Sequence, residues 1–285
     1  MIAAQLPRRP VPVTRILTYV LVVGLAILYA FPFYWMVVIS FKHVSELDTI
    51  PPTLIPLHPT LQNYSDSLLQ PGRYFPTFFK NTAIMVVLGV VGRLVSNTLV
   101  AYGFARIPFK GRSALFVLVL ATMMVPESVL LIPQYLLFKT FGWLDSLLPL
   151  VVPRFFGSAF YIFLLRQFFM TIPRELDEAA IIDGANHFQI FWWIMLPLSG
   201  PILITVFALS FVELWNDFFG PLIYLNSNSK MVVAVALWLF AIPGAQLPIH
   251  LLMAASVVSV LPVIIVFLIC QRYFIRGIAL TGLKG

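Results

Sequence analysis

Charged side chains are scarce in this 285-residue sequence. Asp, Glu, Lys and Arg make up 10% of the residues, whereas hydrophobic residues make up 60% and the mean hydropathy is +0.96. Soluble proteins average about 25% charged residues, because a water-exposed surface has to be covered by polar groups. So few charges exclude a soluble fold of this length. The apolar residues are therefore expected to face a lipid bilayer.

Cysteine is almost absent. Cys270 is the single one in the sequence, which excludes an intramolecular disulfide and a metal site built from several cysteines. It lies in the last apolar run, where we expect it to serve in packing against protein or lipid. We expect no metal and no cofactor.

Motifs of catalysis are also missing. The sequence contains no H-E-x-x-H, no G-x-S-x-G and no G-x-x-x-x-G-K-[ST] phosphate loop, and its four histidines are far apart. An intramembrane enzyme is therefore disfavoured, and the chain is not expected to hydrolyse ATP alone. The net charge of +7 does not indicate nucleic-acid binding, because no basic stripe with interleaved aromatic residues is present.

The N-terminal region carries Arg8, Arg9 and Arg15 ahead of an uncharged run, as a secretory signal peptide does. The run from Ile16 to Phe41 has 26 residues, whereas a signal core has about 7–15, and no A-x-A cleavage site follows. We interpret the run as a retained transmembrane helix.

Six segments are apolar and long enough to cross the roughly 30 Å hydrocarbon core as helices. We predict them at 16–38, 82–104, 113–133, 147–167, 200–222 and 249–271. The Pro-rich stretch 42–78 is predicted to be an irregular aqueous loop. The 41 uncharged residues between Lys230 and Arg272 are too many for one crossing. Pro243, Gly244 and Pro248 divide them, so we also predict a short re-entrant or interfacial helix near 231–241.

Basic residues set the orientation, since cytoplasmic loops are enriched in Lys and Arg. One side would hold eleven of them in short segments, namely Arg8, Arg9, Arg15, Arg106, Lys110, Arg112, Arg166, Arg174, Arg272, Arg276 and Lys284. The other side would hold five in longer loops, namely Lys42, Arg73, Lys80, Lys139 and Lys230. We therefore predict a cytoplasmic N-terminus (1–15), a membrane domain (16–272) and a cytoplasmic tail (273–285).

The cytoplasmic segment 171–197 is predicted to form two short helices joined by a turn. Pro173 suits a first helical turn, Gly184 a left-handed end of the first helix, and Asn186 the N-cap of the second. An apolar face of the second helix is predicted from residues at helical spacing, namely Phe188, Phe191, Trp192 and Met195. Pro197 and Pro201 are expected to close it.

The same segment carries a spaced motif. Glu178-Ala179-Ala180, three residues, Gly184, nine residues, Ile194, one residue and Leu196-Pro197 match EAA-x3-G-x9-I-x-LP of bacterial ABC importer permeases at all fixed positions. The chain resembles the carbohydrate (maltose-type) branch, and within it the shorter of the two sugar permeases. The stretches "NTAIMVVLGVVGRLVSNTLVAYGFARIPFKGR", "VELWNDFFGPLI" and "GIALTGLKG" agree, although Leu283 departs from the usual tail.

The resemblance implies an all-α membrane protein with six transmembrane helices and a cytoplasmic coupling pair between spans four and five. It implies four partners: a homologous second permease, a dimer of ATP-binding cassette ATPases, an extracytoplasmic solute-binding protein and the bacterial inner membrane. The residues implied to dock the ATPase are Glu178, Ala179, Ala180, Asp183, Gly184, Ala185, Ile194, Leu196 and Pro197. The alternative for this segment is an amphipathic helix lying passively on the membrane.

Charges inside the predicted spans are the second candidate site. A charge at the bilayer centre costs at least about 2.5–3.5 kcal/mol and normally faces protein or water. Glu213, Trp215, Asn216 and Asp217 either line a translocation path or pair with Arg93, Arg154 or the partner permease. Glu127, after Pro126, is expected near the outer mouth.

A secondary transporter or channel remains the rival interpretation, but it would require inverted halves with broken helices. No such internal symmetry is visible. The sequence does not name the solute, which is a sugar, oligosaccharide, polyol or glycerol phosphate in permeases of this kind.

Overall fold

The computed structural model describes residues 13–70, 74–242 and 247–282, and within these ranges the chain is helical and contains no β-strand. Residues 1–12, Arg73, Pro243, Gly244 and residues 283–285 lie outside them. The chain divides into two compact units. The first comprises residues up to 67 with 247–257, and the second comprises 68–246 with 258–285.

The first unit is built on a long apolar helix. Its elements are α1 (Val13–Phe41), the 3-10 turn η1 (Val44–Glu46), most of α2 (Gln62–Leu69) and the beginning of α14 (Ile249–Gly282). The 29 residues of α1 extend about 43 Å, enough to cross a bilayer. The predicted first span is therefore present as one helix.

The loop that follows α1 is more ordered than the sequence suggested. The buried Glu46 carboxylate accepts hydrogen bonds from the backbone N–H groups of Leu57 at 2.8 Å and His58 at 2.7 Å. Asn63 Nδ2 donates to the carbonyl oxygens of Ser40 and Lys42. Side chains thus satisfy backbone groups that an irregular loop leaves open, and the loop ends in α2, a helix that we did not predict.

The second unit contains the remaining helices, several of them short. They are α3 (Phe75–Arg106), α4 (Arg112–Ala121), η2 (Thr122–Met124), α5 (Glu127–Thr140), α6 (Leu148–Val151), η3 (Val152–Phe156), α7 (Ala159–Thr171), α8 (Glu175–Ile182), α9 (His187–Ile190), the π-helical turn η4 (Phe191–Met195), α10 (Leu196–Leu198), α11 (Gly200–Trp215), α12 (Phe219–Tyr224), η5 (Asn228–Lys230) and α13 (Val233–Ala241). Helix α13 confirms the short helix predicted near 231–241.

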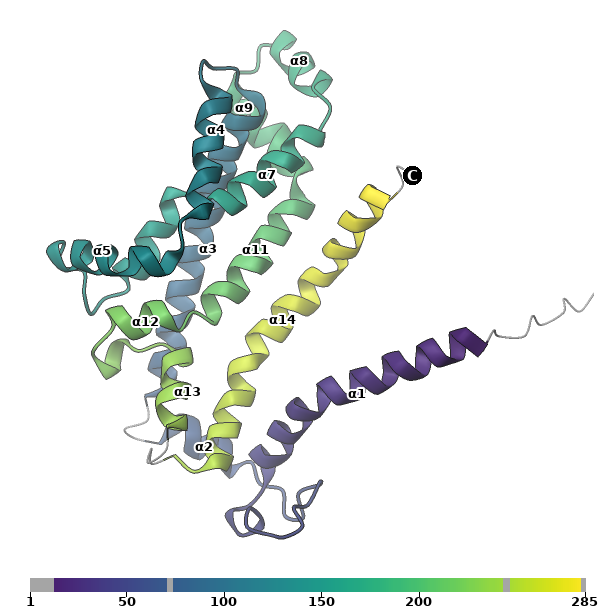
Figure 1. Cartoon of the computed structure of the whole chain (residues 1–285), viewed down its shortest axis with the longest axis vertical. Coiled ribbons are helices and arrows are strands. Elements are labelled where there is room, and N and C mark those ends of the chain that lie inside the picture. The colour runs from purple at the N-terminus through teal and green to yellow at the C-terminus, as the bar shows by residue number, and fades with distance from the viewer. Residues whose placement is uncertain (1–12, 71–73, 243–246, 283–285) are drawn as a thin grey trace, which may run out of the picture. The chain divides into compact units, whose positions relative to one another are not determined.

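Helix α3 is the centre of this unit, and α7 and α11 pack along it (Figure 1). Small residues of α3 allow η3 and α11 to pack closely against it. A Cβ added to Gly92 would lie 2.6 Å from Phe155 Cδ2 of η3, and one added to Gly89 would lie 2.8 Å from Leu214 Cδ1 of α11. Close approach over small residues is how helices associate where no water drives them together.

The third predicted span is not one straight helix. Helices α4 and α5 meet at 94°, so the continuous crossing predicted at 113–133 is wrong. Pro126 is the N-cap residue of α5. Proline lacks a backbone N–H and disfavours a helical residue before it, and Val125 is correspondingly extended. The break was not predicted because the residues on both sides of it are apolar.

The fourth and fifth predicted spans are interrupted as well. The segment Leu148–Thr171 contains the 3-10 stretch η3 and a left-handed Gly157 (φ 87°). Helix α11 ends at Trp215, and α12 begins after a three-residue break. There Asn216 Nδ2 donates to Val212 O, and Asp217 Oδ1 accepts from Gly220 N–H. Such side-chain bonds to backbone compete with the helix.

By length and composition, four helices in the described ranges can cross a membrane, or up to six if each bent pair is one span. The four are Thr14–Phe41, Phe75–Arg106, Leu148–Thr171 and Ile249–Tyr273. The all-helical membrane architecture is thus confirmed.

Candidate functional sites

Helices α8 and α9 form the predicted helix–turn–helix. Gly184 follows α8 with φ 87°, a left-handed conformation that glycine adopts without steric cost. Asn186 caps α9: its side chain accepts from Gln189 N–H at 2.9 Å, while the Gln189 side chain accepts from Asn186 N–H at 2.8 Å. Both boundary residues act as predicted. Pro173 does not, because α8 begins at Glu175.

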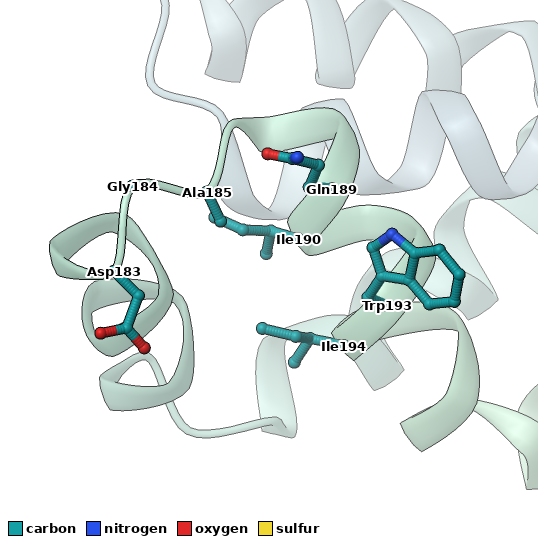
Figure 2. Close-up of a pocket in the computed structure, with 7 residues that line it drawn as sticks. All are labelled: Asp183, Gly184, Ala185, Gln189, Ile190, Trp193 and Ile194. Carbon is teal, nitrogen blue, oxygen red and sulfur yellow. The ribbon is translucent and has the colours of Figure 1, made fainter.

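A shallow surface pocket of about 260 Å³ lies between the turn that follows α8 and the residues of α9 and η4. Figure 2 shows Asp183 and the Gly184–Ala185 turn on one side of it, and Ile190, Trp193 and Ile194 on the other. The pocket includes four of the nine residues predicted to dock an ATPase.

The apolar face predicted for the second helix is confirmed for Phe191 and Met195 but not for Phe188 and Trp192. Ile190, Phe191 and Met195 are buried, but Phe188 and Trp192 are 64% and 50% exposed. The turn at Phe191–Met195 is π-helical, so the 3.6-residue spacing on which the prediction rested does not hold after Ile190. The helix also continues past Pro197 to Leu198 before α11 begins at a 78° bend.

The predicted docking residues differ in exposure. Glu178, Ala179, Asp183, Gly184 and Pro197 are exposed, whereas Ala185, Ile194 and Leu196 are half-buried. Ala180 is buried, with a relative exposure of 9%. Ala179 and Ala180 therefore do not form one accessible small-residue face: Ala179 faces outward and Ala180 packs inward.

Two side chains of α3 reach this segment. Arg106, the last residue of α3, forms an ion pair with Asp177 of α8 (Nη1–Oδ2, 3.2 Å) and donates from Nη2 to Phe169 O and Ile172 O. Tyr102, one turn earlier, donates its hydroxyl hydrogen to His187 O at 3.1 Å and packs its ring against Phe191. Neither residue was singled out from the sequence, because their partners are 71 and 85 positions away.

Four of the charges predicted to lie within the spans form one cluster. Arg93 of α3 makes a two-pronged ion pair with Glu213 of α11, one N–H···O distance being 2.7 Å. Arg154 lies 3.9 Å from Glu213 and 3.6 Å from Asp217. Tyr161, which the sequence did not indicate, donates to Glu213 Oε2 at 3.1 Å. The ion-pairing interpretation is therefore borne out by the geometry of these four charges.

The other residues predicted to line a path differ in their exposure to solvent. Asn216 is exposed, and Asp217 is half-buried. Trp215 instead points into the core, where its indole N–H donates to Ser259 O at 3.0 Å and its ring stacks on Phe211. Glu213 itself keeps half of its side chain exposed. The accessible polar surface consists of Glu213 and Asn216 with part of Asp217.

In the described ranges no three His, Cys, Asp or Glu side chains are grouped to hold a metal ion. The two sites are an exposed helix–turn–helix surface and a charge-paired polar surface between helices.

The family model described as "Binding-protein-dependent transport system inner membrane component" matches residues 95–280, which include the helix–turn–helix and all of the charge cluster except Arg93. The chain belongs to this family. It is therefore a membrane-embedded permease component of a binding-protein-dependent transporter, and the resemblance inferred from the coupling motif is confirmed. An enzyme or a stand-alone secondary transporter is correspondingly disfavoured.

Named family members extend over nearly the whole chain. The trehalose/maltose transport system permease protein MalG of Thermococcus litoralis is 33% identical over 272 residues, 95% of this chain and 97% of its own length. The arabinooligosaccharides transport system permease protein AraQ of Bacillus subtilis is 35% identical and covers 92% of both chains. The sn-glycerol-3-phosphate transport system permease protein UgpE of Yersinia pestis is 34% identical over 264 residues, 90% of this chain and 93% of its own length.

A solved permease has the same fold. A chain from the crystal structure of a bacterial ABC transporter involved in the import of the acidic polysaccharide alginate superposes with a TM-score of 0.83. It has 25% sequence identity, and the match covers 95% of this chain and 100% of that chain.

Proposed function

We propose that the chain is the shorter permease subunit of an ABC importer that moves a sugar or a related polyol into the cytoplasm. The observation that carries this proposal is the pair α8–α9. Its motif residues are spaced as in the importer family, and its turn is fixed by Gly184 and Asn186. The named relatives, which transport maltose or trehalose, arabinooligosaccharides and glycerol 3-phosphate, support the solute class.

The membrane domain (16–272) crosses the bilayer six times in this proposal. The crossings are α1, α3, the bent pair α4–α5, α6–α7, α11 with α12, and α14. Both termini face the cytoplasm of a bacterial-type cell, as does the coupling segment. The distribution of Lys and Arg supports this orientation.

The partners are a homologous second permease, two ATP-binding cassette subunits and an extracytoplasmic binding protein. ATP is hydrolysed by the cassette subunits, since this sequence has no phosphate loop. Exposed Glu178 pairs with a basic residue of a cassette subunit, and Asp183, Gly184, Ala185 and Ile194 form the surface that it contacts. The accessible side chains of Glu213, Asn216 and Asp217 face the solute path, while the ion pairs with Arg93 and Arg154 offset their charges.

Site-directed cross-linking tests the docking surface. Ala179 is replaced by cysteine in a Cys270→Ser background, and the complete transporter, purified with its partner subunits, is treated with a short bifunctional maleimide. We expect a cross-link from position 179 to an ATP-binding subunit. A cysteine at Asn228, an exposed residue on the predicted opposite side, is the control. A cross-link from 228 and none from 179 would refute the proposal.

Uptake measurements test the solute. Proteoliposomes containing the transporter and its copurified binding protein are given ATP inside and labelled maltose, trehalose, arabinotriose or glycerol 3-phosphate outside. We expect uptake of at least one neutral sugar. Asn216→Ala should change this uptake, whereas ATP hydrolysis by the complex should remain measurable. Accumulation of none of these solutes would contradict the carbohydrate assignment.

A further inference from the structure

We infer that Arg106, assisted by Tyr102, is the positioning residue that makes α3 follow the coupling segment, so that a displacement of α8 and α9 reaches the charge cluster. This inference rests on the proposed docking of that segment on an ATPase. It concerns what lies behind the docking surface.

A single guanidinium joins three elements. Arg106 is the last residue of α3, and its fork contacts Asp177 of α8 and two carbonyl oxygens, those of Phe169 and Ile172, at the end of α7. Carbonyls at a helix C-terminus carry partial negative charge, and Phe169 O accepts from Arg106 in addition to the Ile172 N–H. Arginine suits such a site because its several donors are held in one rigid plane.

The contacts of Arg106 are strong because they are buried. The Arg106 side chain is 3% exposed and that of Asp177 is 16% exposed, so water competes weakly for their hydrogen bonds and salt screens them little. Within α8, Ala180 packs inward while Ile181 and Ile182 are 51% and 86% exposed. The Arg106–Asp177 ion pair is therefore one of the main contacts that hold α8, most of whose residues are exposed, against the rest of the unit.

Tyr102 attaches the second helix of the segment. Its hydroxyl donates to His187 O at the beginning of α9, and its ring centroid lies 5.1 Å from that of Phe191. Tyr102 and Arg106 are four residues apart and thus on the same side of α3. One face of one helix consequently holds both α8 and α9.

The same helix leads to the intramembrane charges. Arg93 lies 13 residues before Arg106, about 20 Å along the helix axis, and is ion-paired to Glu213 of α11. A continuous α-helix is stiff over that length. A displacement of α8 and α9 therefore moves α3 and, through the Arg93–Glu213 ion pair, α11. It is not taken up by changes in the loops that precede and follow α8.

The test distinguishes the attachment of α8 to α3 from the docking of α8 on an ATPase. Asp177→Asn and Arg106→Gln are introduced into the complete transporter, with Glu175→Gln as the control. Glu175 is exposed, lies in the same turn of α8 and loses the same charge. We expect uptake per ATP hydrolysed to fall by about tenfold or more in the first two variants, the factor that loss of one hydrogen bond to a charged group supports. Arg106→Lys should retain part of the activity, and Glu175→Gln should resemble the parent.

A distance measurement gives a readout independent of the solute. Spin labels at Leu176 of α8 and Val95 of α3, both exposed, are compared without nucleotide and after trapping with ATP and vanadate. In the parent the separation should stay constant, because α3 moves with α8. In Asp177→Asn it should change or broaden on trapping.

Three outcomes would overturn the inference: a separation that changes in the parent, unchanged uptake per ATP in both variants, or loss of the cross-link from position 179 in the variants. The last would show that Arg106 merely preserves the docking surface. Absence of that cross-link in the parent would instead refute the proposed function itself.

Discussion

Gly92 is a position where η3 packs closely against α3. A Cβ there would meet three carbons of the Phe155 ring at 2.6–2.9 Å. We expect Gly92→Ala to lower the free energy of unfolding by about 1–3 kcal/mol, because the ring has to move in a packed environment. Thermal unfolding of the purified protein in detergent measures the change.

Gly103 of the same helix is the matched control. Nothing lies within 4 Å of its added Cβ, so Gly103→Ala should leave stability unchanged or raise it by up to about 1 kcal/mol. Equal effects of the two substitutions would contradict the packing argument.

The loop after α1 is expected to respond to acid through Glu46. The Leu57 N–H donates to this carboxylate and, more than any other contact, lowers its pKa below the ordinary value of 4.5. Burial opposes the shift, and the His58 N–H adds to it. A carboxyl group whose folded pKa is depressed stabilises the folded state above its unfolded pKa and ceases to do so as the pH falls through the folded value.

Hydrogen exchange at the Leu57 and His58 amides is the measurement. Protection should be constant from pH 7 to about 5 and should decrease, after correction for intrinsic exchange rates, as the pH falls below the ordinary glutamate pKa of 4.5. Glu46→Gln should show reduced protection over the whole range. Asp145 should titrate only in stronger acid, since the Ser227 side chain and nearby N–H groups lower its pKa further.

Residues with a local conformational task were predictable from the sequence. Gly184 and Asn186 were found by the preference of glycine for left-handed backbone and of asparagine for helix N-caps. Arg106, Tyr102 and Tyr161 were not, because their roles come from partners far away in the chain. The contact of Trp215, a predicted path candidate, was not predictable either, because its partner Ser259 lies on α14.

Among the elements, α3 and α11 are joined by the best-paired charges of the membrane region. Arg93 has a side chain 4% exposed and contacts Glu213 through two nitrogens, whereas Arg154 is 29% exposed and lies 3.6–3.9 Å from its partners. We therefore expect Arg93→Met to destabilise the fold by about 2–3 kcal/mol. This is less than a fully buried pair would lose, because Glu213 stays half exposed.

Arg154→Met is the comparison, and it should cost less than about 1 kcal/mol. Chemical or thermal unfolding in the same detergent ranks the two variants. The reverse order would show that Arg154, and not Arg93, fixes α11.

Element prediction succeeded where an apolar run is unbroken and failed at interruptions. Helices α1, α3 and α14 were recognised by length and hydropathy. The bend at Pro126, the break after Trp215 and the π-helical turn at Phe191–Met195 were missed, because hydropathy does not register which backbone groups are bonded. Proline and the Asn216–Asp217 pair were visible in the sequence, and their preference for helix ends was outweighed by the surrounding apolar residues.

At the scale of the whole molecule, orientation in the membrane is the prediction to check. In a Cys270→Ser background, cysteines are placed at Ala179 and at Asn228, both exposed. A membrane-impermeant maleimide added to intact cells, or to spheroplasts if an outer membrane is present, should label position 228. Position 179 should react only after lysis. Labelling of 179 from outside would invert the topology and remove the basis for docking.

The family, the all-helical architecture and the class of function followed from composition and one spaced motif. The count of six crossings and the orientation remain predictions, since length and composition support four to six.

The break between α11 and α12 has an electrostatic consequence. In the proposed topology this break lies within the bilayer, where hydrocarbon cannot solvate the carbonyl groups at the end of α11 or the N–H groups at the start of α12 that lack helical partners, so the break has to border water or polar protein. Glu213 lies less than one turn before the break and is half exposed, so it borders the same water or polar protein. The local dielectric constant is then higher than that of lipid, and the interruption of the helix lowers the energy needed to keep four ionised side chains within the bilayer.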